Sequence, residues 1–254
     1  MVGIGSGPVL VLSGISQGFS RGTADPWQQA LSDASLSVHA GEVVAVIGGR
    51  SSGKTTLLGS AAGVTVPEAG SVRLGDIELT GLSARERGKL RGREVLWLNR
   101  VGVAAKLRVW KLVSWSLADG LGRGERERRI AEALERVGAS KCAQSCWGEL
   151  TRFEQVLVGY AQALAGRPCL VVIDDLLDGL GEPRTKETSD LLRSLIEETG
   201  RSWGVLMSAT DRESALYADR VWALERGRLI PTAGHRDSAA EVFPFSPRRA
   251  VVDK

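Results

Sequence analysis

Apolar residues gather in short runs along the chain, and glycine, proline or charged residues bound most of these runs. Runs of about four to eight apolar residues are typical of buried strands, whereas alternation of apolar and polar residues indicates a strand with one exposed face. On this basis the expected strands are residues 8–15, 31–39, 43–47, 71–80 (a hairpin around Gly75 and Asp76), 94–98, 169–173, 204–208 and 221–224.

Helices are predicted between these strands from the spacing of apolar residues and from signals at the helix ends. Ser83 and Glu86 have the spacing of a capping box, and Pro183 suits the first turn of a helix. The expected helices are 54–62, 83–91, most of 107–166, 183–199 and a short one from Asp211, with a loop over 16–29. Because strands alternate with helices, the fold class is α/β, with a mostly parallel sheet flanked by helices.

A glycine-rich turn separates the strand at 43–47 from the helix that follows it. The spacing of Gly48, Gly53, Lys54 and Thr55 fits the phosphate-binding loop G-x-x-x-x-G-K-[ST]. Glycines let backbone N–H groups approach phosphate oxygens, and the helix N-terminus adds partial positive charge. The alternative is a chance glycine loop before a helix. The residues expected to bind the nucleotide here are Gly48, Gly49, Arg50, Ser51, Ser52, Gly53, Lys54, Thr55 and Thr56.

Two acids, Asp174 and Asp175, follow the apolar run at 169–173. A phosphate-binding loop needs a Mg²⁺ ligand from a neighbouring strand, and Asp174 is placed for that role. Lys54 is expected to reach the β and γ phosphates, and the Thr55 hydroxyl to bind Mg²⁺ together with the carboxylate of Asp174. A helix cap or a surface acid is the alternative for Asp174. Buried strands seldom end in two acids without a functional reason, so the pair Asp174 and Asp175 favours a site for Mg²⁺ and ATP.

Composition limits the remaining choices. The chain of 254 residues has ordinary apolar and charged fractions, 43% and 25%, and a net charge of +3, too small to indicate nucleic-acid binding by itself. No apolar run approaches a membrane span and the N-terminus lacks signal-peptide features, so we expect a cytosolic chain. Of its three cysteines, Cys142 and Cys146 are four residues apart, and packing thiols are expected instead of disulfides or a metal site.

These motifs together resemble the nucleotide-binding subunit of an ATP-binding-cassette (ABC) transporter over about residues 8–232. The resemblance implies the P-loop NTPase fold of ABC type, with an N-terminal antiparallel β part and a helical subdomain. It implies one nucleotide-binding domain at 1–232, with a helical subdomain of about 99–166 inserted in it, and a C-terminal tail at 233–254. It also implies that Phe19 stacks on adenine, with core packing as the alternative.

The stretch 79–91 is similar to a subgroup that drives lipoprotein extraction and macrolide export with a permease. Family members sandwich two nucleotides between two subunits arranged head to tail, so a homodimer or heterodimer is expected. The resemblance implies a peripheral position on the inner face of the cell membrane, through a permease that contacts about Asn99 to Arg108. Nucleic acid is not an expected partner, although the basic residues between Arg85 and Arg93 motivate an alternative as a soluble relative acting on it.

The chain departs from the family pattern at the positions that serve hydrolysis. Asn99 stands where a glutamine helps bind Mg²⁺ or water, and Asp175 stands where a glutamate positions the attacking water. Thr210 replaces the switch histidine, and 178–181 replaces the motif Ser-Ala-Leu-Asp between subunits. These substitutions predict that Mg·ATP binding is retained and that hydrolysis is slow.

The signature motif also differs. Leu-Ser-Gly-Gly-Gln, which binds the opposite subunit's nucleotide in the family, reads Leu150 to Glu154 here, so Thr151, Arg152 and Phe153 occupy the positions that would contact it. Side chains in place of two glycines obstruct close backbone approach. The leading prediction is an ABC-type ATPase subunit with weakened catalysis. The alternative is a non-catalytic scaffold subunit for which ATP is a structural ligand.

Overall fold

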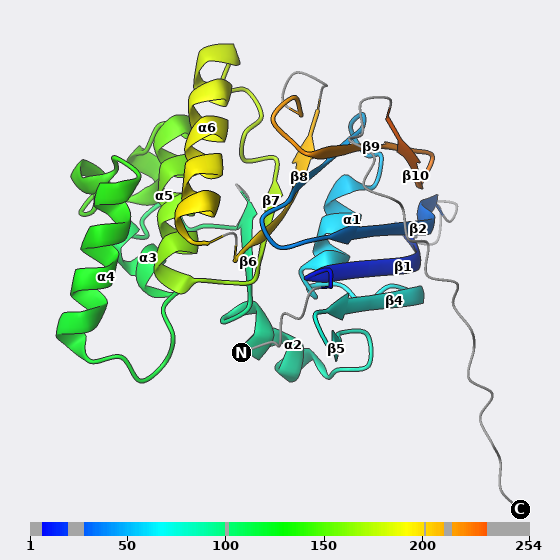
Figure 1. Ribbon diagram of the computed structural model, residues 1–254, viewed down its shortest axis with the longest axis horizontal. Coiled ribbons are helices and arrows are strands. Elements are labelled where there is room, and N and C mark those ends of the chain that lie inside the picture. The colour runs from blue at the N-terminus through cyan, green and yellow to red at the C-terminus, as the bar shows by residue number, and fades with distance from the viewer. Residues whose placement is uncertain (1–6, 20–27, 100–101, 201, 211–214, 233–254) are drawn as a thin grey trace, which may run out of the picture.

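Two β-sheets form the framework of the protein (Figure 1). The computed structural model describes residues 7–19, 28–99, 102–200, 202–210 and 215–232. The larger sheet has six strands in the order β10-β9-β3-β8-β7-β6, and the smaller has four in the order β2-β1-β4-β5. The predicted α/β class, with a mostly parallel core and an N-terminal antiparallel part, is therefore confirmed.

The larger sheet carries the phosphate-binding loop. Neighbouring strands from β9 to β6 run parallel, and only β10 pairs antiparallel with its neighbour. Its strands are β3 (Val43–Ile47), β6 (Val95–Asn99), β7 (Leu170–Asp174), β8 (Gly204–Ala209), β9 (Arg220–Glu225) and β10 (Arg228–Pro231). The strands β7 and β8 are apolar and buried along nearly their whole length, as expected where helices cover both faces of a parallel sheet. Their carboxyl ends therefore meet at one edge, where the candidate site lies.

The smaller sheet is antiparallel and its strands are half exposed. It consists of β1 (Leu10–Phe19), β2 (Gln28–Val38), β4 (Ala69–Leu74) and β5 (Ile77–Glu78). The expected loop at 16–29 is wrong at both ends, because β1 continues to Phe19 and β2 begins at Gln28. Register shifts after Leu12 interrupt the alternation of apolar and polar residues in β1, which explains why the sequence pattern ended early.

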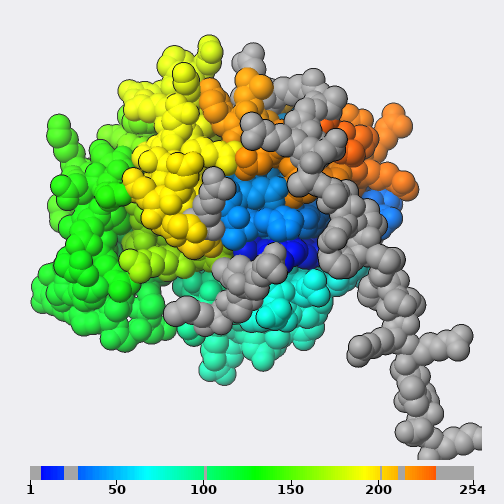
Figure 2. All heavy atoms as spheres, viewed as in Figure 1, coloured from blue at the N-terminus to red at the C-terminus, as the bar shows by residue number. Residues whose placement is uncertain are grey.

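Helices divide the core into two clusters. The helix α1 (Lys54–Ala61) contacts β1 and β2 of the smaller sheet and β7 and β8 of the larger one, so it lies between the sheets. The helices α3 (Val109–Ser114), α4 (Arg123–Arg136), α5 (Arg152–Gly166) and α6 (Glu182–Glu198) gather on the other side of the larger sheet, where they form one flank of the surface in Figure 2. The helix α2 (Ala84–Arg91) is capped by the predicted box of Ser83 and Glu86.

Helices α3 to α5, with two short 3₁₀ turns, Ser140–Cys142 and Trp147–Glu149, occupy the region predicted to be helical. The strand β10 was not predicted, because its four residues follow a tight turn and lie at a sheet edge. The predicted tail at 233–254 and the start of the predicted helix at Asp211 lie outside the described residues. Residues 215–217 form a turn.

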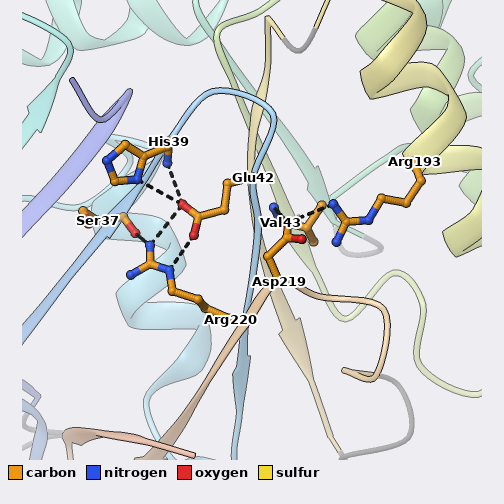
Figure 3. Close-up of polar contacts among 7 residues, drawn as sticks. All are labelled: Ser37, His39, Glu42, Val43, Arg193, Asp219 and Arg220. Atoms are coloured by element: carbon orange, nitrogen blue, oxygen red, sulfur yellow. Dashed lines mark hydrogen bonds and ion pairs between the residues drawn. The ribbon is translucent and has the colours of Figure 1, made fainter. Parts of the chain in front are cut away.

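Polar contacts hold the opposite end of the parallel sheet (Figure 3). Glu42, just before β3, accepts a hydrogen bond from Arg220 Nη2 at 3.0 Å and from the His39 backbone N–H at 2.8 Å. Asp219 Oδ2 accepts from the Val43 N–H and from Arg193 Nη1, both at 2.8 Å. These contacts fix the entry to β3 relative to β9 and α6, while the phosphate-binding loop leaves the other end of the same strand.

Candidate functional site

The phosphate-binding loop runs from the end of β3 into α1. Gly53 has φ of 106°, and a Cβ on it would lie 2.4 Å from the carbonyl oxygen of Ala30. A Cβ on Gly48 would lie 2.6 Å from Ser52 Oγ and 2.9 Å from the carbonyl oxygen of Leu224. Both motif glycines are therefore required by packing as well as by phosphate chemistry, whereas a Cβ on Gly49 would meet nothing within 4 Å.

Lys54 is buried at the first turn of α1, and its ammonium lies over the loop. Its Nζ donates to the carbonyl oxygens of Gly48 at 2.6 Å and Gly49 at 3.0 Å. A buried ammonium is stable only where such acceptors or an anion compensate its desolvation. The buried Oγ of Ser52 has no hydrogen-bond partner among the described residues, so the loop also presents a free hydroxyl. A cation, a free hydroxyl and a helix N-terminus suit a phosphate group.

Asp174 and Thr55 meet across the gap between β7 and α1. Thr55 Oγ1 donates to Asp174 Oδ1 at 3.4 Å. Hydroxyl and carboxylate oxygens are hard ligands that suit Mg²⁺, which binds proteins through one or two carboxylates and completes its shell with water and phosphate oxygens. Asn99 ends β6 in register with Asp174, so the structure places all three predicted metal ligands at one edge of the sheet.

Ser208 joins the two acids at the end of β7, and sequence reasoning did not identify it. Its buried Oγ lies 3.1 Å from Asp174 Oδ1 and 3.3 Å from Asp175 Oδ1, and it accepts a hydrogen bond from the Asp175 N–H at 2.8 Å. Asp175 has φ of 52°, a left-handed conformation that aspartate tolerates better than most residues. The available signal was a lone polar residue near the end of the otherwise apolar strand 204–209.

Asp178 is a third carboxylate in the site, which the sequence had assigned only to the contact between subunits. Its Oδ1 accepts from Thr210 Oγ1 at 3.4 Å. Burial, and then the neighbouring charge of Asp175, raise the pKa of Asp178, while Lys54 and hydrogen bonds from Thr210 oppose the shift. The same two causes raise the pKa of Asp174, opposed by Ser208, Thr55 and Lys54. Asp174 and Asp178 are therefore each repelled by the charge of Asp175 and attracted by the ammonium of Lys54.

Phe19 and the signature segment are the remaining positions predicted to bind nucleotide. Phe19 is 45% exposed at the end of β1, which argues against core packing and leaves its ring open to a ligand. Thr151 caps α5, Arg152 Nη1 donates to the carbonyl oxygen of Asp178 at 2.7 Å, and the Phe153 ring lies 4.0 Å from the guanidinium carbon of Arg184. The contacts predicted for Phe19 and for 151–153 with nucleotide remain predictions.

Cysteine chemistry plays no part in this geometry. Cys142 and Cys169 are buried, and burial is the main cause that raises the pKa of both thiols, that of Cys169 to about 12. Within the ranges that the structure describes, no group of three or more His, Cys, Asp and Glu side chains is arranged to hold a metal ion. A Mg²⁺ site here would therefore depend on Thr55, Asp174 and Asn99 together with water and phosphate oxygens.

Comparison with known proteins places this geometry in one family. The ABC transporter family model matches residues 31–177. The lipoprotein-releasing system ATP-binding protein LolD of Cereibacter sphaeroides is 32% identical over 224 residues, 87% of this chain and 99% of that protein. The methionine import ATP-binding protein MetN of Rhizobium etli is 31% identical over 203 residues, 79% of this chain and 56% of that protein.

Solved structures agree at the level of the fold. The dimeric ATP-binding cassette MJ0796 bound to ADP and Pi superposes with a TM-score of 0.77 at 23% identity, covering 87% of this chain and 96% of that one. The structure of cbiO1 from Clostridium perfringens superposes with a TM-score of 0.73 at 23% identity, covering 88% of this chain and 87% of that one.

The chain therefore belongs to the ABC transporter family and has the P-loop NTPase fold of its ATP-binding cassettes. Within that family it is a transporter ATP-binding subunit with LolD and MetN proteins among its relatives. No helix in the described part of the chain is long and apolar enough to cross a membrane.

Proposed function

We propose that the chain binds Mg·ATP, dimerises around it and drives or gates a membrane permease, with slow ATP hydrolysis. The observation that carries the proposal is the contrast within one site. The positions of Lys54 over the loop and of Thr55 beside Asp174 support retained binding of Mg·ATP, whereas the residues at the positions that serve hydrolysis in the family are altered.

The altered groups at the γ-phosphate end support slow turnover. Asp175 supplies a carboxylate that is one methylene shorter than glutamate, and a misplacement of about 1 Å can lower a rate by roughly 10²-fold. Thr210 carries no imidazole, and its hydroxyl already donates to Asp178. Lys54 and Mg²⁺ would therefore have to stabilise the transition-state charge on the phosphoryl oxygens, because the side chain at position 210 contributes no positive charge.

A permease partner is supported by the surface near the end of β6. Residues 102–108 are mostly exposed, while Val103 and Leu107 pack against the helical core. An exposed segment that is held in place by two packed side chains suits a docking site. We propose that residues 102–108 contact a permease. The relatives named above are a lipoprotein-releasing and a methionine import protein, so this partnership would place the chain on the inner face of the cell membrane.

The alternative as a scaffold subunit is favoured by one specific observation. Thr151, Arg152 and Phe153 have partners within their own chain and lack the glycine backbone that approaches a neighbour's nucleotide. Action on nucleic acid has less support, because Arg87 Nη1 and Arg91 Nη1 donate to backbone carbonyl oxygens of the protein itself.

The bound nucleotide decides between these functions. The purified full chain is incubated with radiolabelled Mg·ATP and separated from free nucleotide, with Lys54→Ala as the control for contaminating hydrolase. Bound label that turns to ADP over time, and only when Lys54 is present, supports the slow ATPase. Label retained as ATP for hours would identify the scaffold instead. Absence of bound label in the wild-type chain would refute both.

A further inference from the structure

The start of α5 is fastened to the segment that follows β7. Two side chains that replace signature glycines make this connection, Arg152 to the Asp178 carbonyl oxygen and Phe153 to the guanidinium of Arg184. Thr151 is also engaged locally, since its hydroxyl lies 2.7 Å from Glu154 Oε2 and accepts from the Glu154 N–H at 3.3 Å. The segment therefore makes a set of contacts within its own chain.

Arg152 and Gly179 are fitted to each other. Gly179 has φ of 76°, and a Cβ on it would lie 2.3 Å from Arg152 Nη1. The guanidinium thus occupies the space that any other side chain at 179 would fill, and it reaches the carbonyl oxygen of Asp178 at 2.7 Å only because that space is open. The departure from the family pattern in the signature segment and the glycine at 179 form one structural feature.

The residue held by Arg152 faces the nucleotide site. The carbonyl oxygen of Asp178 accepts from Arg152, and the carboxylate of the same residue accepts from Thr210 Oγ1 at 3.4 Å. The charge of Asp175 raises the pKa of Asp178 and that of Lys54 lowers it, so the carboxylate lies within electrostatic reach of both groups. A movement of the Asp178 backbone would move this carboxylate relative to Thr210 and Lys54.

We propose that Arg152 is a positioning residue that acts within its own chain and holds the Asp178 carboxylate in the nucleotide site through the Asp178 backbone. The signature segment then influences the nucleotide of its own subunit, in addition to any contact with a neighbour's. This inference rests on the proposed function for its effect on nucleotide, but the contact itself can be tested without nucleotide.

The first measurement is hydrogen–deuterium exchange of peptides covering 175–181 in the nucleotide-free full chain. Arg152→Ala is expected to speed exchange there about tenfold, because the Asp178 carbonyl oxygen loses a charged donor. Gly179→Ala should also speed exchange, by displacing the guanidinium and by straining alanine at φ of 76°, and the part due to the guanidinium should be absent when it is added to Arg152→Ala. Arg123→Ala is the control, an exposed arginine at the start of α4 that pairs with Glu127 and takes no part in this connection. Unchanged exchange in Arg152→Ala would overturn the inference.

The second measurement is the dissociation rate of Mg·ATP from the same variants. Arg152→Ala and Asp178→Asn are expected to change the rate by the same factor, about three- to tenfold, and the double variant by no more than either alone. Arg152→Lys, which keeps a charged donor, should restore part of the wild-type rate. Additive effects, or an Arg152 effect that appears only at protein concentrations where the chain dimerises, would show that Arg152 acts elsewhere. A wild-type chain that binds no ATP would refute the proposed function, while exchange would still decide the contact.

Discussion

Ser208→Ala tests whether one buried hydroxyl organises the two acids of the site. The hydroxyl accepts the Asp175 N–H and lies within hydrogen-bond distance of one oxygen each on Asp174 and Asp175. A neutral hydrogen bond contributes about 1 kcal/mol, and one to a charged group about 1.5–3 kcal/mol. Because a single proton serves both carboxylates, the expected loss of unfolding free energy is about 2–4 kcal/mol.

The same change affects metal binding through the charge of Asp174. Burial raises the pKa of Asp174 and the Ser208 hydrogen bond lowers it, so Ser208→Ala should raise the pKa further. Below that pKa the carboxyl is protonated and is a poor Mg²⁺ ligand. The pH at which Mg²⁺-dependent ATP affinity is lost should therefore move upward. In the unfolded chain this carboxyl has its ordinary pKa, so its ionisation lowers stability as pH rises through the raised value.

Denaturant unfolding and titration calorimetry of Mg·ATP between about pH 5 and 8 measure both effects. Ser60→Ala is the matched control, because Ser60 is equally buried but bonds only to Thr56 and Thr65. Its expected loss is about 1 kcal/mol, with no shift in the pH dependence. The reasoning is refuted if Ser208→Ala destabilises no more than Ser60→Ala and leaves the pH midpoint unchanged.

Three further substitutions test other parts of the fold and site. Gly53→Ala should lower the free energy of unfolding by about 2 kcal/mol in thermal unfolding, because φ of 106° strains alanine and its Cβ would meet a backbone carbonyl oxygen. Gly49→Ala is the control and should change stability far less, because a Cβ there meets open space. Arg220→Ala should cost about 3 kcal/mol in the same assay, because the largely buried Glu42 loses its arginine and keeps only its contacts with His39. Arg123→Ala, in a pair on the exposed face of α4, should stay close to wild type. Asp175→Glu should speed ATP hydrolysis about tenfold in single-turnover assays by extending the carboxylate one methylene, and an unchanged rate would place the deficiency elsewhere.

The phosphate-binding loop and Asp174 were predictable because their information is local. A fixed spacing of glycines, Lys54 and Thr55 between a strand and a helix defines the loop, and two acids after an apolar run define the end of a strand. The confirmed capping box of Ser83 and Glu86 is local in the same way. The extension of β1 to Phe19 was missed because its register shifts hide the alternation from the sequence.

Ser208 and Asp178 could not be placed from sequence, because their roles depend on strand order and loop path. Ser208 reaches the two acids only because β8 pairs beside β7, an arrangement that periodicity does not specify. Asp178 meets Arg152 across 26 residues and Thr210 across 32, and both contacts require the finished fold. Residues that complete the site therefore became visible only when distant segments were brought together.

The residues that depart from the family pattern contact one another, so they are not independent losses of hydrolytic function. Thr210, in the switch-histidine position, donates to Asp178, whose backbone accepts from Arg152 in the signature segment, and Gly179 makes room for that contact. Substitutions at four positions that would each weaken hydrolysis thus form one connected set of contacts in a single chain. If nucleotide binding had been lost together with hydrolysis, the binding loop would have no reason to stay intact and the altered residues no reason to fit one another. This connection favours a site in which nucleotide is still bound and its effect is transmitted through Asp178.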